Sequence, residues 1–250
     1  MSDASLNNQV ALITGASSGI GQAIAQTFVQ AGAHLVVVAR REERLQQLAD
    51  LAQQADRQCK IIVGDVRQPE VAQQAVEAAF ADFGQLDILV NNAGIGRYGD
   101  LVNASIDDYD AMMDTNMRST FLFTHAAVPR LLQQKRGTII VISSMAGVMG
   151  FPGEAIYCST KFAQVGFALA MERELRPHGI RVGIVMPGGV KTEFAIGTGR
   201  TEAGVAASGM LEARDVANAA LLMATQPPHA RIVEIRMRPM AEPYYGIEPS

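Results

Sequence analysis

The sequence is poor in the residues and segments that mark several large classes of protein. Its 250 residues include only two cysteines, Cys59 and Cys158, too few for the disulfide framework of a small secreted domain, which suggests a reducing compartment. Lysine and arginine number 21 against 25 aspartate and glutamate, and this lack of a cationic surplus argues against nucleic acid as the main partner. The four histidines are scattered without metal-ligand spacing, so no metal site is expected.

Long apolar runs are missing as well. No stretch approaches the ~20 apolar residues that a membrane-spanning helix requires, and residues 1–9 are polar, without the basic and apolar regions of a signal peptide. We therefore expect a cytoplasmic protein with no membrane partner. A hydrophobic content of 48% with 18% charged residues supplies a sizeable core and excludes intrinsic disorder, and the length allows one large domain or two small ones.

Short apolar runs alternate with longer amphipathic segments along the chain. Strands are predicted at residues 10–14, 34–39, 60–64, 86–91, 137–143, 181–186 and 231–236. Helices are predicted at residues 19–32, 41–54, 69–83, 105–134, 154–177 and 212–225. Near-continuous apolar strands joined by helices indicate an α/β fold, a doubly wound parallel sheet of about seven strands with helices on both faces (Rossmann-like).

A glycine-rich turn follows the first predicted strand and opens the first helix, with the sequence Thr-Gly-Ala-Ser-Ser-Gly-Ile-Gly at residues 14–21. In this context such a turn binds a dinucleotide pyrophosphate, because the N–H groups and dipole of the helix N-terminus favour an anion. Gly15 permits the tight turn, Gly19 lets the backbone approach phosphate, and Gly21 lets the helix pack against the strand. The alternative is a tight turn without a ligand. The candidate cofactor contacts here are Gly15, Ser17, Ser18, Gly19, Ile20 and Gly21.

The TGxxxGxG spacing of this turn resembles the short-chain dehydrogenase/reductase (SDR) family, single-domain type. Further motifs resemble that family in the same order along residues 10–192. They are Asn-Asn-Ala-Gly at 91–94, Asn116 on the following helix, Ser144 after the fifth strand, Tyr157-Cys-Ser-Thr-Lys161 as YxxxK, and Pro-Gly-Gly-Val-Lys-Thr at 187–192. Because these motifs are interleaved along one sheet and no linker divides the chain, we expect a single domain over residues 1–250, with residues 193–211 as a substrate-covering loop.

Tyr157 and Lys161 lie four residues apart, so on a helix they share one face. A free tyrosine has a pKa of about 10 and is a poor base at neutral pH, but a nearby ammonium group favours the phenolate and lowers that pKa. The pair can then transfer a proton to or from an alcohol or carbonyl oxygen. The alternative is an ordinary polar pair on a solvated helix face.

The resemblance implies roles for two further catalytic candidates. Ser144 holds the substrate oxygen, and its spacing to Tyr157 selects it over Ser143. Asn116 anchors a water in a proton relay through Lys161 and the cofactor ribose; its alternative is a helix-interior asparagine that bonds to local backbone.

The resemblance also implies the remaining cofactor contacts. Val190 and Thr192 are expected at the carboxamide, Asn92 and Gly94 at the ribose, and Asp65 with Val66 at the adenine. The full set beyond the glycine turn is Arg40, Arg41, Asp65, Val66, Asn92, Ala93, Gly94, Tyr157, Lys161, Pro187, Gly188, Val190 and Thr192.

Arg40 and Arg41 follow the second predicted strand, about where NAD enzymes of this architecture place Asp or Glu to bind the ribose 2′-hydroxyl. A carboxylate repels a 2′-phosphate, whereas a guanidinium group binds one with charge-assisted hydrogen bonds. We therefore expect NADP(H) rather than NAD(H). The alternative is that both arginines are solvated residues at a helix start.

These observations lead to an NADP(H)-dependent oxidoreductase that interconverts a carbonyl and a secondary alcohol; the alternative is a catalytically silent SDR-like sensor or regulator that binds NADP(H). The partner is a small carbonyl or alcohol substrate, and Arg97 or Arg238 is a candidate for pairing with a substrate carboxylate. By resemblance, the chain forms a homo-oligomer, a tetramer or dimer, through helices 105–134 and 154–177. The substrate pocket is expected to be walled by Ile95, Met145, Phe151 and Phe194.

Overall fold

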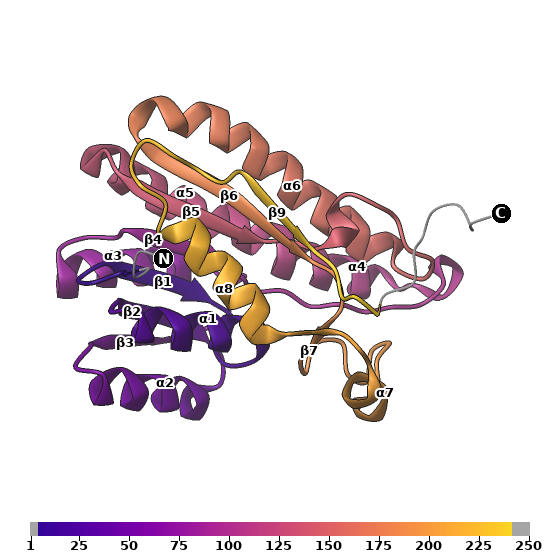
Figure 1. Cartoon of the computed structure of the whole chain (residues 1–250). Helices are drawn as coiled ribbons and strands as arrows, with labels where there is room; N and C mark the ends of the chain where they lie inside the picture. The colour runs from indigo at the N-terminus through magenta and orange to yellow at the C-terminus, as the bar shows by residue number, and fades with distance from the viewer. Residues whose placement is uncertain (1–4, 242–250) are drawn as a thin grey trace.

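The computed structural model describes residues 5–241, so both ends of the predicted 1–250 domain lie outside the described residues. Its centre is a parallel sheet in the order β3-β2-β1-β4-β5-β6-β9 (Figure 1). The strands are β1 (Val10–Thr14), β2 (His34–Ala39), β3 (Cys59–Val63), β4 (Ile88–Asn91), β5 (Gly137–Ile142), β6 (Ile180–Pro187) and β9 (Glu234–Met237). The predicted doubly wound α/β architecture, Rossmann-like, is confirmed.

The strands form because both faces of the sheet are covered. Every residue of β1 is buried, and Leu12 pairs with Val36 of β2 on one side and Leu89 of β4 on the other. Alternate residues of β1 point to opposite faces, so Ile13 belongs to one apolar core and Leu12 to the other. Such strands read as unbroken apolar runs.

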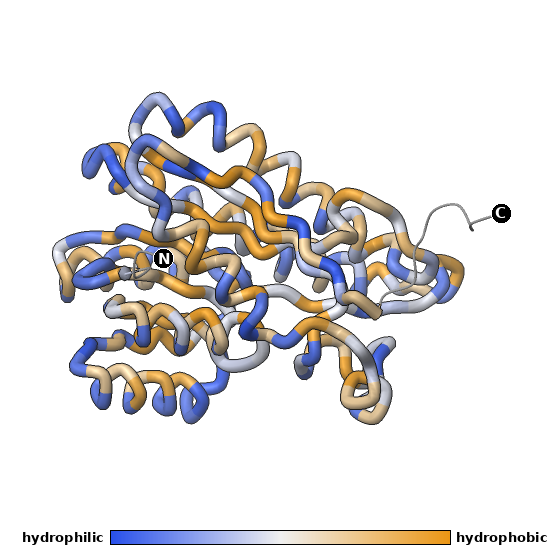
Figure 2. Tube along the Cα trace, in the orientation of Figure 1, coloured by the Kyte–Doolittle hydropathy of each residue, from blue (hydrophilic) through white to orange (hydrophobic). Residues whose placement is uncertain are grey.

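Two helical layers cover these faces. One core is closed by α1, α2 and α8 and the other by α3, α5 and α6 (Figure 1), and the apolar residues concentrate along the sheet between them (Figure 2). These helices are α1 (Gly19–Gln30), α2 (Glu42–Gln54), α3 (Pro69–Phe83), α5 (Ser119–Gln134), α6 (Ala155–Leu175) and α8 (Ala213–Ala224). Short 3-10 turns are η1 (Leu101–Asn103), η3 (Met145–Gly147) and η4 (Arg176–His178). No helix of residues 5–241 combines the length and the apolar character needed to cross a membrane.

The helical stretch predicted over residues 105–134 is present from Ile106 to Gln134, but it is not α-helical throughout. The structure has α4 (Ile106–Met112), then a π-helical segment η2 (Met113–Arg118), and then α5. The wider π turn leaves backbone carbonyls to side-chain donors: Ser119 Oγ donates to the carbonyl of Thr115 at 2.6 Å, and Thr120 Oγ donates to that of Asn116 at 2.8 Å. Such π segments are frequent at functional sites.

The C-terminal elements also differ from expectation. The last strand pairs with β6 over residues 234–237, later than the predicted 231–236. The expected loop 193–211 contains a short helix, α7 (Glu202–Ala207), and its end pairs as β8 (Leu211–Glu212) with β7 (Val190–Lys191).

Candidate functional site

A pocket of about 1130 Å³ opens where the strands end, between the segments that follow β1 to β6. Parallel strands place their carboxyl ends at one edge of the sheet, where ligands bind in open α/β folds. Of the predicted catalytic, cofactor-binding and pocket-wall residues, all but Gly21 and Asn116 line it. The lining residues among them are Gly15, Ser17, Ser18, Gly19, Ile20, Arg40, Arg41, Asp65, Val66, Asn92, Ala93, Gly94, Ile95, Ser144, Met145, Phe151, Tyr157, Lys161, Pro187, Gly188, Val190, Thr192 and Phe194.

The glycine turn is shaped by contacts beneath it. Gly15 and Gly19 adopt φ of 67° and 55°, the left-handed region that favours glycine. Asn92 Nδ2 donates to the carbonyls of Thr14 at 2.9 Å and Gly15 at 3.3 Å. A Cβ on Gly21 would lie 2.4 Å from both Asn92 Nδ2 and the Gly15 oxygen, so Gly21 supports the turn from below instead of lining the pocket.

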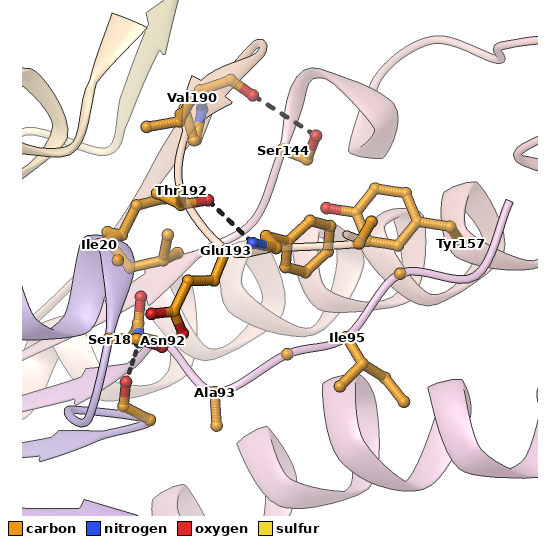
Figure 3. Close-up of a pocket in the computed structure, with 18 of the residues that line it drawn as sticks. Ser18, Ile20, Asn92, Ala93, Ile95, Ser144, Tyr157, Val190, Thr192 and Glu193 are labelled. Atoms are coloured by element: carbon orange, nitrogen blue, oxygen red, sulfur yellow. Dashed lines mark hydrogen bonds between the residues drawn. The ribbon is translucent and has the colours of Figure 1, made fainter. Parts of the chain in front are cut away.

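The N-terminus of α1 faces this turn without a side-chain cap, because Ser18 makes no capping hydrogen bond. Its first N–H groups therefore remain donors for an anion. Figure 3 shows Ser18, Ile20, Asn92 and Ala93 together in one part of the pocket, away from Tyr157.

Two arginines lie at the end of the pocket formed by β2. Arg41 Nε donates to Ser17 Oγ at 3.3 Å, and its guanidinium group forms an ion pair with Glu193 at 2.9 Å. Arg40 is exposed. Hydrogen bonds from Arg67 hold the pKa of the Asp65 carboxyl below its usual value, and the charge of Arg40 adds to this effect. Arg67 and Glu193 were not predicted as site residues, because no local motif marks them.

Tyr157 and Lys161 do share one face of α6, and the Nζ of Lys161 lies 5.6 Å from the centre of the Tyr157 ring. Burial raises the pKa of Tyr157, and a hydrogen bond with Ser144 only partly opposes that effect. The sequence predicted that Lys161 lowers the pKa of Tyr157, but the pKa of Tyr157 is raised. Burial also lowers the pKa of Lys161, to about 7, which weakens the ammonium charge beside the phenol.

The two serines after β5 have separate roles in the local structure. Ser143 Oγ donates to the carbonyl of Lys161 at 3.2 Å and is buried. Ser144 Oγ accepts from the N–H of Ala146 at 3.1 Å and donates to the carbonyl of Pro187 at 3.4 Å. Figure 3 shows the Ser144 and Tyr157 hydroxyls at the same end of the pocket.

Asn116 is buried behind the pocket, in η2. Its side-chain amide accepts from the N–H of Ile95 at 2.8 Å and donates to Thr160 Oγ at 2.9 Å, so it joins the segment after β4 to α6. Its main-chain carbonyl accepts from Thr120 Oγ at 2.8 Å and from Gln164 Nε2 at 2.9 Å. Gln164 was not predicted as a site residue, although it lies one turn after Lys161.

An aromatic cluster forms the other half of the pocket. The Tyr157 ring contacts Tyr98 and Phe194, with ring centres 5.6 and 5.7 Å apart. The guanidinium group of Arg200 lies 5.8 Å from the Tyr98 and Phe194 rings. Arg97 and Arg238 were the predicted candidate cations; Arg97 lines the pocket but forms an ion pair with Asp108, and Arg238 does not line it.

Segment 193–211 is attached to the loop after β4. Thr198 Oγ donates to the carbonyl of Gly96 at 2.8 Å, and the N–H of Tyr98 donates to the carbonyl of Thr198 at 2.8 Å. These bonds fix residues 194–200 over the aromatic cluster, with Arg200 lining the pocket.

The lowered pKa of Lys161 predicts a pH dependence of stability. The folded chain titrates this group near pH 7, whereas the unfolded chain keeps a value near 10.5, so the unfolded state binds more protons between these values. The free energy of unfolding should therefore rise with pH above about 7, by up to about 1.4 kcal/mol per pH unit. Lys161→Met should remove this rise in urea denaturation series from pH 6 to 9.

Other groups do not obscure that result. Tyr157, whose pKa is raised, and Cys59, whose pKa burial raises to about 12, titrate in both proteins, so the difference between the two series isolates Lys161. Parallel series for wild type and Lys161→Met would contradict the assignment.

Comparison with known proteins places this geometry in a family. A model of the short chain dehydrogenase family matches residues 9–203. An oxidoreductase of Staphylococcus epidermidis is 35% identical over 95% of this chain and 100% of its own, and one of Staphylococcus aureus is 34% identical over 94% and 99%.

Solved structures agree with these relatives. The closed form of a serine dehydrogenase complexed with NADP+ has a TM-score of 0.89 at 31% identity, covering 97% of this chain and 99% of that chain. A metagenomic short-chain oxidoreductase in complex with NADP has a TM-score of 0.81 at 32% identity, covering 95% and 99%. A carveol dehydrogenase from Mycobacterium avium in complex with NAD scores 0.85 at 27% identity, covering 93% and 97%. The chain is therefore an oxidoreductase that belongs to the short-chain dehydrogenase/reductase family.

Proposed function

We propose that this protein is an NADP(H)-dependent oxidoreductase that interconverts a carbonyl and a secondary alcohol. One observation carries the proposal: the hydroxyls of Tyr157 and Ser144 and the ammonium group of Lys161 line one end of the same pocket whose other end holds the glycine turn and Arg40. A proton-transfer site and an anion site thus face one continuous space, as a dinucleotide-dependent reaction on a small molecule requires.

The pocket fits a dinucleotide. The uncapped first turn of α1 would hold the pyrophosphate, and glycine is needed there because a Cβ on Gly19 would lie 3.1 Å from the Thr192 side chain across the groove. Val190 and Thr192 would hold the nicotinamide carboxamide, and Asp65 with Val66 would lie at the adenine. The bound nicotinamide supplies or accepts the hydride.

Arg40 and Arg41 support NADP(H) as the preferred cofactor. Both line the pocket where β2 ends, and guanidinium groups suit the phosphate at the ribose 2′ position. Two of the similar structures bind NADP or NADP+, and another binds NAD, so the arginines carry this part of the proposal.

The chain's own residues handle the proton. Tyr157 donates it to the carbonyl oxygen in reduction and accepts it from the alcohol in oxidation, and Ser144 holds that oxygen beside the phenol. A charged Lys161 favours the phenolate form of Tyr157 and so acts against the effect of burial. Segment 193–211 would cover the substrate, with Phe194 excluding water from the reacting oxygen.

A panel of carbonyl compounds with NADPH and with NADH tests the proposal. We expect NADPH consumption with at least one ketone or aldehyde and a higher kcat/KM with NADPH than with NADH. The panel includes oxo acids, each tested beside its methyl ester. This pairing tests for recognition of a substrate carboxylate, because Arg200 lines the pocket and a guanidinium group binds carboxylates. The alternative, a silent NADP(H) sensor, predicts tight NADPH binding with no turnover across the panel; the intact Tyr157–Lys161 pair argues against it.

A further inference from the structure

Gln164 connects two parts of the candidate catalytic machinery. It lies on α6 one turn after Lys161 and is fully buried, with 0% of its surface exposed. Its Oε1 accepts from Lys161 Nζ at 2.9 Å, and its Nε2 donates to the main-chain carbonyl of Asn116 at 2.9 Å and to Thr120 Oγ at 2.8 Å. A buried amide with this many partners holds a single orientation.

The direction of that amide follows from its partners. The carbonyl of Asn116 can only accept a hydrogen bond, so it must face the NH₂ group of Gln164. The carbonyl oxygen of Gln164 then faces Lys161, whose ammonium group can only donate. No alternative flip satisfies both contacts, so Gln164 always presents an acceptor to Lys161.

Lys161 has a second fixed acceptor, the carbonyl of Ile142 at 3.2 Å. Two of its three N–H donors are thus engaged by protein acceptors, which leaves one for a group in the pocket that Lys161 lines. Within residues 5–241 no carboxylate forms an ion pair with this buried lysine, so neutral acceptors alone compensate its charge. The ammonium form depends on them, because a buried cation without acceptors loses its proton.

We infer that Gln164 is a positioning residue that holds Lys161 in its charged form and directs its remaining N–H toward the pocket. The inference rests on the proposed function for its effect on turnover, but the contact itself is independent of any reaction. It also differs from what the family resemblance implies. The carbonyl of Asn116 accepts two protein donors, and the Gln164 amide lies between it and Lys161.

Two nearly isosteric substitutions with opposite effects test the inference. Gln164→Met removes the acceptor, and Gln164→Glu replaces it with a charged one. Each is compared with the same variant carrying Lys161→Met, by urea denaturation as a function of pH, so that the difference reports the titration of Lys161 alone. In wild type we expect the difference to begin to rise near pH 7, because burial lowers the pKa of Lys161 to about 7. We expect Gln164→Met to move that onset down by about one to two pH units and Gln164→Glu to move it up by a similar amount.

Thr120→Val is the matched control. It removes another partner of Gln164 but leaves Lys161 untouched, so it should lower stability without moving the onset. Shifts in the same direction for Gln164→Met and Gln164→Glu, no shift in either, or an equal shift in Thr120→Val would overturn the inference.

Kinetics separate the inference from the proposed function. With a substrate from the panel, Gln164→Met should lower kcat about 10-fold with little change in KM, and the pH limb of kcat should move in opposite directions in the two Gln164 variants. If wild type turns over no carbonyl, the proposed function fails, while the denaturation series still decides the role of Gln164.

Discussion

Tyr157→Phe is expected to lower kcat by on the order of 1,000-fold while leaving the Kd for NADPH within a factor of about two. Positioned acid–base groups contribute about 10²- to 10⁴-fold to a reaction, and Phe keeps the ring that contacts Tyr98 and Phe194 while removing the only atom that carries the proton. The reaction is followed by NADPH absorbance with the best substrate of the panel, and binding by NADPH fluorescence.

Tyr109→Phe provides the matched control, because Tyr109 is 44% exposed on α4 and lies outside the pocket. It should leave kcat unchanged. If Tyr157→Phe keeps turnover within about tenfold of wild type, Tyr157 is not the proton donor and the proposed mechanism is wrong. If it loses NADPH binding as well, the loss of turnover cannot be assigned to proton transfer, and the role given to Tyr157 fails.

Arg40→Asp is expected to lower the ratio of kcat/KM for NADPH to that for NADH by at least about 100-fold. The guanidinium group attracts a 2′-phosphate, whereas a carboxylate at the same place repels it and accepts from a ribose 2′-hydroxyl. Losing a charge-assisted hydrogen bond and adding a repulsion each cost about 1.5–3 kcal/mol, and each 1.4 kcal/mol is tenfold. The measurement is the steady-state kcat/KM with each cofactor at a fixed substrate concentration.

Arg44→Asp makes the same change of charge on α2 but does not line the pocket. It should keep the cofactor ratio within about threefold of wild type. An equal change in both variants would show a general electrostatic effect, and a wild-type preference for NADH would contradict the role given to Arg40. Arg41 remains in both variants, held by Ser17 and Glu193.

The sheet could be predicted from the sequence because each buried parallel strand is a local run of apolar residues. The glycine turn could be predicted because its three glycines lie within a few residues of one another. Site residues could be predicted where they lie within two residues of the end of a strand, as Ser144 and Asn92 do. The contacts of Thr198 with Gly96 and of Gln164 with Asn116 join residues 102 and 48 positions apart. No local pattern specifies such pairs.

Two differences have an energetic origin. The helix predicted over residues 105–134 has the right periodicity, but side-chain donors from α5 and α6 take backbone carbonyls that a regular helix would use. The pKa of Tyr157 was expected to follow its charged neighbour, but the burial of both groups outweighs that attraction. Burial depends on the whole fold, so the i, i+4 spacing of Tyr157 and Lys161 could not reveal it.

The π-helical segment has a consequence for how this chain can change. A π turn contains one residue more than an α turn. It therefore rotates the side chains that precede it about the helix axis, relative to those that follow it. Asn116 faces the segment after β4 and α6, where it contacts Ile95 and Thr160, whereas Phe123 and Ala127 of α5 pack into the core. The coupling between α5 and Asn116 therefore runs through Thr120, which donates to the Asn116 carbonyl, and a substitution at Phe123 or Ala127 changes the core without removing that contact.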